Sequence, residues 1–283
     1  MSIPFRKMNG LGNDFVVLDA RDKAIPMSGD LAAAIADRTT GVGCDQLIIM
    51  EKAQSRADVF MRIYNQDGTE VAACGNATRC IAHVLMNEMG RNAITVETDS
   101  GLLACTREND MITVDMGAPK FDWEDIPLTE RMDTRLLDIR IGPIDAPVLI
   151  GPSAVNVGNP HCIFFVEDVA AHDLEKFGPM IENHPLFPEK ANVSLAAITA
   201  PGAIRLRVWE RGVGITKACG TAACAVVPAA SRKGLSPRKA IVTLNGGPLN
   251  IDWAEHNDHI YMTGPVTLDY EGTLDASLFE GQS

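Results

Sequence analysis

Two cysteines stand in matching sequence contexts. Cys74 and Cys219 each occupy the middle of an Ala-Cys-Gly tripeptide that precedes a predicted helix. The N-terminus of a helix carries unpaired N–H groups and a partial positive charge, which stabilise a thiolate, so we expect both thiol pKa values to fall towards neutrality. The same N–H groups can hold a carboxylate. The pattern predicts an acid/base group beside an anion cradle, twice in one chain.

The two tripeptides belong to an internal repeat. Residues 62–65 (Arg-Ile-Tyr-Asn) recur at 207–210 as Arg-Val-Trp-Glu, and 73–77 recur at 218–222 as Ala-Cys-Gly-Thr-Ala, both with an offset of 145. Gly12-Asn13 matches Gly158-Asn159, and Gln46 matches Asn192, with an offset of 146. Matches in one order at nearly constant spacing predict two copies of one fold, each about 140 residues long.

Short runs typical of strands fill both copies. The predicted strands are 15–19, 47–50, 59–64, 94–98 and 111–116 in the first copy, and 163–166, 193–198, 204–209, 241–244 and 259–262 in the second. A helix is predicted after each Ala-Cys-Gly, one running to about Met89 before Gly90 and one ending near Lys233 before Gly234. Lesser helices are predicted at 30–38, after Ser28, and around 168–183. The layout is α+β, with a linker at 117–127, so the domains are predicted as 1–118 and 119–263.

A duplicated cysteine suits one kind of chemistry. If the two halves face each other, a substrate carboxylate can be held with one thiol on each side of its α-carbon. One thiolate then removes the α-proton from one face, and the opposite thiol delivers a proton to the other face. This would invert a stereocentre without a cofactor. Free cysteine is otherwise often a small buried hydrophobe, which is the interpretation we give to the remaining cysteines, Cys44, Cys80, Cys105, Cys162 and Cys224.

The composition points to a soluble enzyme of the cytoplasm. The formal charge is −12 and the pI about 4.9, which disfavours nucleic-acid and anionic-membrane partners. The chain shows neither a signal-peptide core at residues 1–7 nor an apolar run long enough for a membrane span. The seven cysteines contain no CxxC pair, which indicates reduced thiols and no metal site.

The motif set resembles that of diaminopimelate epimerase over almost the whole chain. The matching segments are 7–15, 64–68, 74–76, 159–162, 210–214 and 218–221. The resemblance implies an epimerase that needs no pyridoxal phosphate or other cofactor and interconverts LL- and meso-diaminopimelate for lysine and peptidoglycan synthesis. It further implies two pseudo-symmetric domains, each a mixed β-sheet wrapped around a central helix, with the active site in the cleft between them. By analogy, the tail from about 264 to 283 completes the first domain, and a homodimer is expected.

The resemblance also assigns roles to residues. It makes Cys74 and Cys219 the acid/base pair, with His161 and Glu210 beside the reacting centre. The groups expected to bind substrate are the backbone of Gly75, Asn76, Gly220 and Thr221 at the reacting carboxylate, and Asn13, Asn65, Asn159, Asn192 and Arg211 at the distal end, with Gln46 lining the same site. A guanidinium suits bidentate carboxylate binding, which supports Arg211 independently. The chain departs from the family pattern at Asn9, Ala77, Ser194, Ile215 and Ala222.

Other functions stay open at this level. A racemase or isomerase of the same fold acting on proline or hydroxyproline would lack a second amino acid end, which the asparagine set and Arg211 argue against. A thiol redox protein would use Cys74 and Cys219 on a peroxide or a disulfide, and the absence of CxxC weakens that hypothesis. A non-catalytic binding module would show no activity in an amino-acid screen. Neither Gly-x-Gly stretch extends to a dinucleotide-binding loop, because Phe15 and Lys217 occupy the third glycine position.

Overall fold

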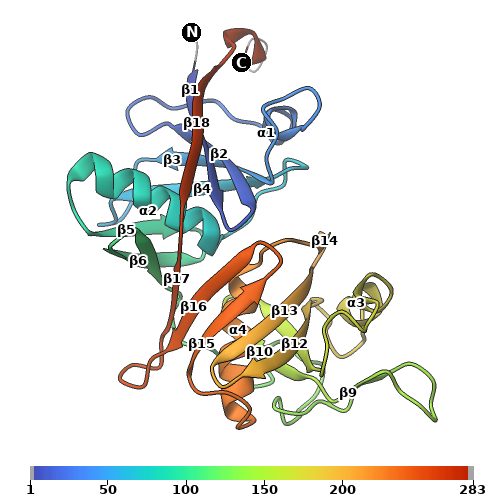
Figure 1. The fold of residues 1–283 in the computed structure, drawn as a ribbon. Helices are drawn as coiled ribbons and strands as arrows, with labels where there is room; N and C mark the ends of the chain where they lie inside the picture. The colour runs from blue at the N-terminus through green and yellow to red at the C-terminus, as the bar shows by residue number, and fades with distance from the viewer. Residues whose placement is uncertain (1–2, 280–283) are drawn as a thin grey trace. The chain divides into compact units, whose positions relative to one another are not determined.

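The chain divides into two units (Figure 1). The structure, a computed structural model, describes residues 3–279. Unit 1 contains the chain up to Val114 and the chain from Gly264 onward, and unit 2 is Asp115–Thr263. Each unit is an α+β fold with a mixed sheet.

The sheet of unit 1 has the strand order β18-β1-β2-β3-β4-β5-β6-β7. Its strands are β1 (Ile3–Gly10), β2 (Asn13–Asp19), β3 (Gln46–Glu51), β4 (Val59–Asn65), β5 (Ala93–Thr98), β6 (Gly101–Glu108), β7 (Met111–Asp115) and β18 (Thr267–Leu274). The β2–β3 and β4–β5 pairs are parallel, and β3 is antiparallel to β4. The late strand β18 lies antiparallel to β1 and so returns the chain to the first sheet.

The sheet of unit 2 has the order β10-β11-β12-β13-β15-β16-β17, with β14 on β13. Its strands are β10 (Ser153–Asn156), β11 (Pro160–Phe165), β12 (Asn192–Ala200), β13 (Ala203–Glu210), β14 (Gly214–Ile215), β15 (Lys239–Leu244), β16 (Gly247–Trp253) and β17 (Ile260–Gly264). β11 is parallel to β12 and β13 to β15. A separate ribbon joins β8 (Arg140–Ile141) to β9 (Leu149–Ile150).

The two sheets repeat one another strand by strand. The run β1 to β5 is antiparallel, parallel, antiparallel and parallel, and β10, β11, β12, β13 and β15 follow the same sequence. The register agrees as well, because Phe15 lies opposite Gln46 and His161 lies opposite Asn192. The repeat seen in the sequence is therefore a repeat of topology.

Each unit is built around one long helix. α2 (Gly75–Met89) contacts β1, β5 and β6, and α4 (Gly220–Arg232) contacts β10, β11, β12, β15 and β16. Both are buried over most of their length, which explains why neither shows the clean polar face of a surface helix. The predicted ends are confirmed, because Gly90 follows α2 with φ 63° and Gly234 lies just beyond α4 with φ 70°.

A shorter helix covers the other face of each sheet. α1 (Gly29–Ala36) begins after Ser28, whose hydroxyl accepts the Leu31 N–H at 3.2 Å, and it packs on β3 and β4. α3 (Leu174–Glu182) packs on β12, β13 and β14. The prediction of a helix from about 168 was wrong at its start, because Asp173 caps the helix and residues 168–173 form turns.

All ten predicted strands are present, but the sequence missed several others. β1, β6, β16 and β18 were not predicted, and neither were the short strands β8, β9, β10 and β14. Apolar and polar residues alternate only weakly along β18, and most of the strand is exposed, so its sequence does not show the pattern of a half-buried strand. Its pairing with β1 is a long-range contact that no local signal reveals.

Candidate functional site

Each candidate acid/base cysteine is the residue immediately before the first turn of a central helix. Cys74 precedes α2 and Cys219 precedes α4, both with an extended backbone. The first backbone hydrogen bonds run from the Thr78 N–H to the Cys74 carbonyl at 2.9 Å, and from the Ala223 N–H to the Cys219 carbonyl at 3.2 Å. The N–H groups of 75–77 and 220–222 therefore have no acceptor within their helix. They include those of Gly75, Asn76, Gly220 and Thr221, the predicted carboxylate cradle.

The seven cysteines differ in accessibility. Cys74 is partly exposed, and Cys219 is 5% exposed. The remaining five are 0–1% exposed and pack in the cores. Their structural interpretation agrees with this burial, and among the seven cysteines only Cys74 is partly exposed.

The expected fall in thiol pKa is wrong for Cys219. Burial raises the pKa of this thiol well above its usual value, and the neighbouring Glu210 carboxylate raises it further, against a smaller lowering by Thr221. The Cys219 sulfur lies 3.5 Å from Thr221 Oγ1. Desolvation destabilises the thiolate by more free energy than the helix N-terminus provides to stabilise it. Burial therefore favours the neutral thiol form of Cys219.

In unit 1 the Asn13 amide is directed at Cys74. Asn13 Nδ2 donates to Asp45 Oδ2 at 2.8 Å, which leaves Asn13 Oδ1 facing the helix start. That oxygen lies 4.0 Å from the Cys74 sulfur and accepts from Asn76 Nδ2 at 3.4 Å. The three predicted residues Asn13, Cys74 and Asn76 are thus brought into one group.

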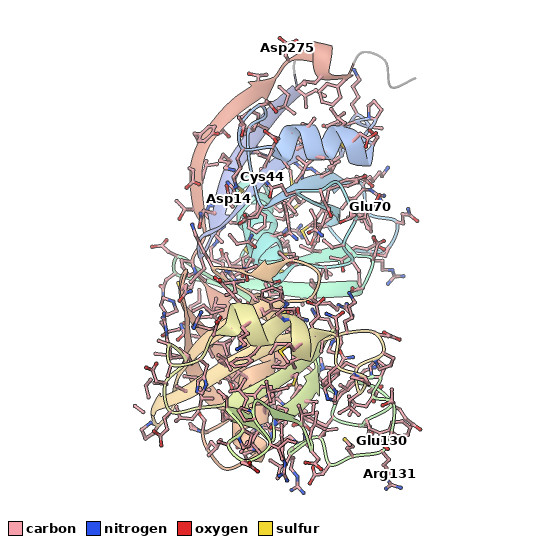
Figure 2. The ribbon with its side chains drawn as sticks, turned by 90° about the vertical axis from the view of Figure 1, so that its right-hand side faces the viewer. Asp14, Cys44, Glu70, Glu130, Arg131 and Asp275 are labelled. Atoms are coloured by element: carbon pink, nitrogen blue, oxygen red, sulfur yellow. The ribbon has the colours of Figure 1, made fainter. Side chains whose placement is uncertain are left out.

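A network of charges supports this amide. Arg38 donates to both oxygens of Asp14 and to Asp45 Oδ1, and Lys7 donates to Asp14 Oδ2 at 2.6 Å and to the Gly43 carbonyl. Burial alone would raise the pKa of Asp14, but Arg38 and Lys7 outweigh it and hold that pKa well below its usual range. Asp14 lies close to Cys44 in this part of unit 1 (Figure 2).

Gln46 and Asn65 form a second polar pair in unit 1. They lie opposite each other on β3 and β4, and Gln46 Nε2 donates to Asn65 Oδ1 at 3.1 Å. Asn65 Nδ2 donates in turn to Thr69 Oγ1 at 3.2 Å. Gln46 Oε1 and Asn76 Oδ1 are buried acceptors for which the structure shows no donor. Buried oxygens of this kind are what a substrate ammonium or hydroxyl can satisfy.

In unit 2 a neutral histidine is held by an asparagine. His161 is fully buried, and its Nε2 lies 2.8 Å from Asn159 Oδ1. Burial, with a smaller contribution from the Arg211 charge, lowers the pKa of His161 to about 3. His161 Nε2 must then carry the proton that Asn159 accepts, so Nδ1 is an unprotonated acceptor, and it is buried with no donor in the structure.

Glu210 and Arg211 follow one another at the end of β13. The Thr216 hydroxyl donates to Glu210 Oε1. The Glu210 carboxylate also interacts with the Cys219 thiol, through its charge and a side-chain hydrogen bond, and raises the pKa of that thiol. Asn192 Oδ1 accepts the Arg211 N–H at 3.0 Å, and the exposed Arg211 guanidinium donates to the Glu189 carbonyl at 2.9 Å. Asn192 Nδ2 donates to the Pro160 carbonyl at 3.1 Å and so ties β12 to β11.

The predicted site residues are divided between the two units. Unit 1 holds Asn13, Gln46, Asn65, Cys74, Gly75 and Asn76, and unit 2 holds Asn159, His161, Asn192, Glu210, Arg211, Cys219, Gly220 and Thr221. Sequence reasoning missed Asp45 and Thr216, which bond directly to Asn13 and Glu210. The available signal was position, because Asp45 precedes Gln46 and Thr216 lies three residues before Cys219.

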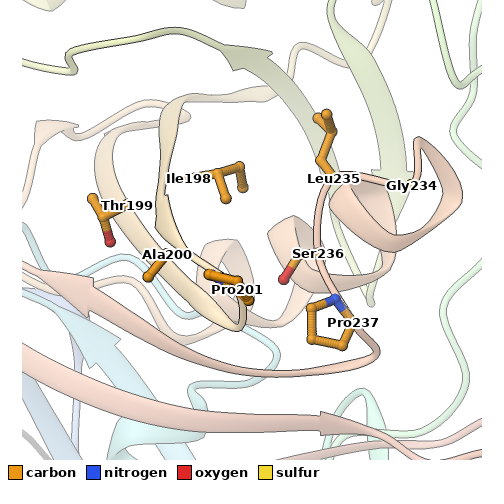
Figure 3. Close-up of a pocket in the computed structure, with 8 residues that line it drawn as sticks. All are labelled: Ile198, Thr199, Ala200, Pro201, Gly234, Leu235, Ser236 and Pro237. Carbon is orange, nitrogen blue, oxygen red and sulfur yellow. The ribbon is translucent and has the colours of Figure 1, made fainter.

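The open hollow in unit 2 lies elsewhere. It is lined by residues 198–201 at the β12–β13 turn and 234–237 after α4 (Figure 3). Its walls carry no charged side chain, and none of the predicted site residues lines it. Over residues 3–279, the His, Cys, Asp and Glu side chains form no group of three or more fit for a metal ion. No helix in the described part of the chain is long and apolar enough to cross a bilayer.

Comparison with known sequences gives a consistent picture. The sequence model of the family described as diaminopimelate epimerase matches residues 5–121 and 153–268. The chain is 51% identical to a diaminopimelate epimerase of Rhodopseudomonas palustris (strain BisA53), over 98% of this chain and 96% of that protein. It is 50% identical to a diaminopimelate epimerase of Nitrobacter hamburgensis, over 97% of this chain and 96% of that protein.

Solved structures of lower identity share the fold. A phenazine biosynthesis protein of the PhzF family from Enterococcus faecalis superposes with a TM-score of 0.68 at 15% identity, covering 97% of this chain and 100% of that one. A hydroxyproline epimerase from Agrobacterium vitis, with bound trans-4-hydroxy-L-proline, gives a TM-score of 0.64 at 15% identity, covering 98% and 94%. These likenesses confirm the predicted two-domain α+β fold.

Proposed function

Since the chain belongs to the diaminopimelate epimerase family, we propose that it interconverts LL- and meso-diaminopimelate by a cofactor-independent, two-cysteine mechanism. The observation that carries this proposal is the placement of Cys74 and Cys219. Each is the residue before the central helix of its own unit, at equivalent points of a duplicated topology. A repeat that preserves a thiol and an anion cradle in both copies is what inversion at one carbon requires.

Inversion needs a base on one face of the α-carbon and an acid on the other. We assign these roles to Cys74 and Cys219, which requires the two half-sites to act on a single substrate. Because burial favours the thiol form of Cys219, it is the donor in one direction, and Cys74 as thiolate is the base. The Cα–H electron pair stays on carbon as its proton passes to the Cys74 sulfur. The Cys219 proton then forms the new C–H bond on the opposite face. Cys74 is now the thiol and Cys219 the thiolate, which is the arrangement that the reverse reaction needs.

The anion cradles stabilise the charge that develops in this step. Loss of the α-proton moves negative charge onto the substrate carboxylate, and N–H groups already aimed at it need no reorganisation. A preorganised donor of this type contributes roughly 3–4 kcal/mol. The N–H groups of Gly75, Asn76, Gly220 and Thr221 are the donors we assign, because they have no acceptor in their own helices.

The polar groups around the cysteines give each end of the substrate a partner. Glu210 is a carboxylate beside Cys219, suited to the reacting ammonium, and neutral His161 offers the buried acceptor Nδ1. We assign Asn13, Gln46, Asn65, Asn159, Asn192 and Arg211 to substrate binding, with Arg211 pairing the distal carboxylate. A substrate with two amino acid ends uses this set fully, whereas a proline-like substrate leaves Arg211 without a carboxylate.

The two units are proposed as the two domains of this enzyme, with the boundary near 118 and the C-terminal tail completing the first. We further propose a cytoplasmic homodimer, carried over from the family resemblance. Light scattering coupled to size-exclusion chromatography would give the molar mass directly. A single species near the chain mass of 30.4 kDa would contradict the dimer.

The function is tested by isotope exchange. Protein treated with a chelator and dialysed free of pyridoxal phosphate is incubated with LL-diaminopimelate in deuterated water, and epimers and α-deuterium are followed by chiral chromatography and mass spectrometry. We expect meso-diaminopimelate to form with deuterium at the inverted α-carbon. L-Proline and trans-4-hydroxy-L-proline serve as comparison substrates. Turnover of either in preference to diaminopimelate would assign another substrate, and peroxide or disulfide turnover without epimerisation would identify a thiol redox protein.

A further inference from the structure

One buried carboxylate lies outside the groups described so far. Glu182, at the end of α3, is 5% exposed. Its Oε2 accepts the Trp209 indole N–H at 2.7 Å, and its Oε1 accepts the Gly212 backbone N–H at 3.0 Å. The Lys190 ammonium lies 3.8 Å from Oε1, at the exposed rim. A carboxylate is buried only where hydrogen bonds and charge compensate its desolvation, and here both oxygens are used.

The two groups that Glu182 binds flank the Glu210–Arg211 dipeptide. Trp209 precedes it and Gly212 follows it, so one side chain fixes both ends of the turn. The turn has a demanding backbone, because Gly212 has φ 75° and the Val213 N–H returns to the Glu210 carbonyl at 3.1 Å. Asn192 holds the middle of this turn through the Arg211 N–H, and Glu182 holds the residues on either side of the dipeptide.

Packing of α3 on β13 keeps Glu182 in place. A Cβ on Gly178, one turn before Glu182, would lie 2.5 Å from the Trp209 ring, so only glycine allows the helix to approach this closely. The close approach brings Glu182 within reach of the indole N–H. α3 carries none of the predicted site residues, yet it contacts the residues on both sides of the Glu210–Arg211 dipeptide.

We propose that Glu182 is a positioning residue of the epimerase site, holding the Glu210–Arg211 turn so that Glu210 meets Cys219 and Arg211 meets the substrate. Its effect on turnover rests on the proposed function. Its effect on Cys219 does not, because the Glu210–Cys219 contact is a property of the chain itself. Burial is the main cause of the raised Cys219 pKa, and the Glu210 carboxylate raises it further. Release of the turn moves that carboxylate, so the thiolate fraction rises and alkylation becomes faster.

The test compares Glu182→Gln with Glu175→Gln, which removes an exposed carboxylate from the same helix. Glutamine keeps one acceptor but turns an NH2 group towards one of the two donors. We expect Glu182→Gln to lower kcat/KM for diaminopimelate at least tenfold, with a rise in KM from the displaced Arg211. The ratio of Cys219 to Cys74 alkylation by iodoacetamide, read by peptide mass spectrometry, should rise at least threefold. For Glu175→Gln, both kcat/KM and the alkylation ratio should stay within twofold of the parent values.

A second variant is needed if Glu182→Gln is unfolded, which alkylation of the five core cysteines would reveal. Trp209→Phe removes only the Oε2 arm and keeps a ring against Gly178, and it should shift the alkylation ratio in the same direction by a smaller factor. Unchanged kinetics and an unchanged alkylation ratio in a folded Glu182→Gln protein, or in Trp209→Phe where the first is unfolded, would overturn the proposal. If the parent protein does not epimerise diaminopimelate, the proposed function fails, while the alkylation ratio still decides the role of Glu182.

Discussion

His161 lies directly opposite Asn192 in the parallel pair of β11 and β12. The equivalent pair in unit 1 is Phe15 opposite Gln46. Duplication has kept the register and changed the chemistry, since a ring that can titrate replaces one that cannot. His161 and Glu210, two titratable side chains of the candidate site, therefore both lie in unit 2 with Cys219. In unit 1 the Cys74 sulfur instead faces the Asn13 amide oxygen, at 4.0 Å.

The buried His161 should make the protein lose stability in mild acid. Its pKa is lowered to about 3 in the fold, against about 6.5 in an unfolded chain. Between these values the unfolded state binds one more proton, so the free energy of unfolding falls as the pH falls, by up to about 1.4 kcal/mol per pH unit. His161→Gln removes this dependence. Urea denaturation should show the parent losing about 3 kcal/mol of unfolding free energy relative to the variant between pH 7 and pH 4.

The control is His256→Gln, which changes an exposed histidine of the same unit. Its profile should follow that of the parent. Parallel profiles for the parent and His161→Gln would mean that His161 is protonated in the folded protein, and the assignment of Nδ1 as an acceptor would fall.

Single cysteine variants should separate the two reaction faces. Cys74→Ala and Cys219→Ala should each lower epimerisation by at least about 100-fold, because inversion loses its acid or its base. A variant with one thiol left can still exchange the α-proton of one epimer with solvent deuterium. Cys224→Ala, a fully buried cysteine of α4, is the control and should retain activity. Near-normal epimerisation by either of the first two variants would exclude the two-base mechanism.

The sequence foretold the central helices well because their signals are local. The tripeptide before each helix and the glycine after it are short-range features, and both ends of α2 and α4 follow from them. The repeat predicted that the two halves share one fold, but it did not give the strand order within that fold. By contrast, β18 reaches β1 across most of the chain, and no local pattern encodes a pairing of that range.

The candidate site residues could be proposed from sequence motifs, but the side chains that hydrogen-bond to them could not. Asn13 and Glu210 stand in recognisable motifs. Their partners Asp45 and Thr216 lie outside those motifs, and only their nearness in sequence to other candidate residues marks them. The prediction of a lowered pKa for the Cys219 thiol was wrong for a physical reason. The sequence shows that Cys219 begins a helix, while the burial that dominates its pKa arises only when β-strands close around α4. Desolvation is a tertiary property, and it outweighs the local one here.

The orientation of the Asn13 amide should depend on Asp45. Asp45→Ala removes the acceptor of Asn13 Nδ2, so the amide can rotate and present either end to Cys74. Loss of one such hydrogen bond to a charged group is worth about 1.5 kcal/mol, or roughly tenfold in kcat/KM. Asp30→Asn, an exposed carboxylate on α1, is the matched control. Steady-state kinetics with circular dichroism would check both, and an unaffected Asp45→Ala would mean that the amide is held by its other contacts.

Specificity for a substrate with two amino acid ends should reside in Arg211. The guanidinium lies at the exposed turn after β13, and its backbone N–H is fixed by Asn192 Oδ1 at 3.0 Å. A distal carboxylate that leaves water needs a charged, hydrogen-bonded partner, and removal of one member of such a pair costs about 2–5 kcal/mol. Arg211→Ala should lower kcat/KM for diaminopimelate at least about 30-fold. The kcat/KM of Arg211→Lys should lie between those of the parent and Arg211→Ala, because lysine keeps the positive charge but lacks the planar guanidinium that binds a carboxylate with two hydrogen bonds.

The matched control is Arg131→Ala, which removes an exposed guanidinium elsewhere in unit 2 (Figure 2) and should leave the kinetics unchanged. Alkylation of Cys74 and Cys219 by a neutral reagent should proceed at the parent rate in Arg211→Ala, because the helices and thiols do not depend on the guanidinium. A fall in kcat/KM with altered thiol reactivity would mean that Arg211 acts through the site's structure. Unchanged kinetics on diaminopimelate would show that Arg211 does not bind the distal carboxylate, and the substrate would have to be sought among amino acids with a single charged end.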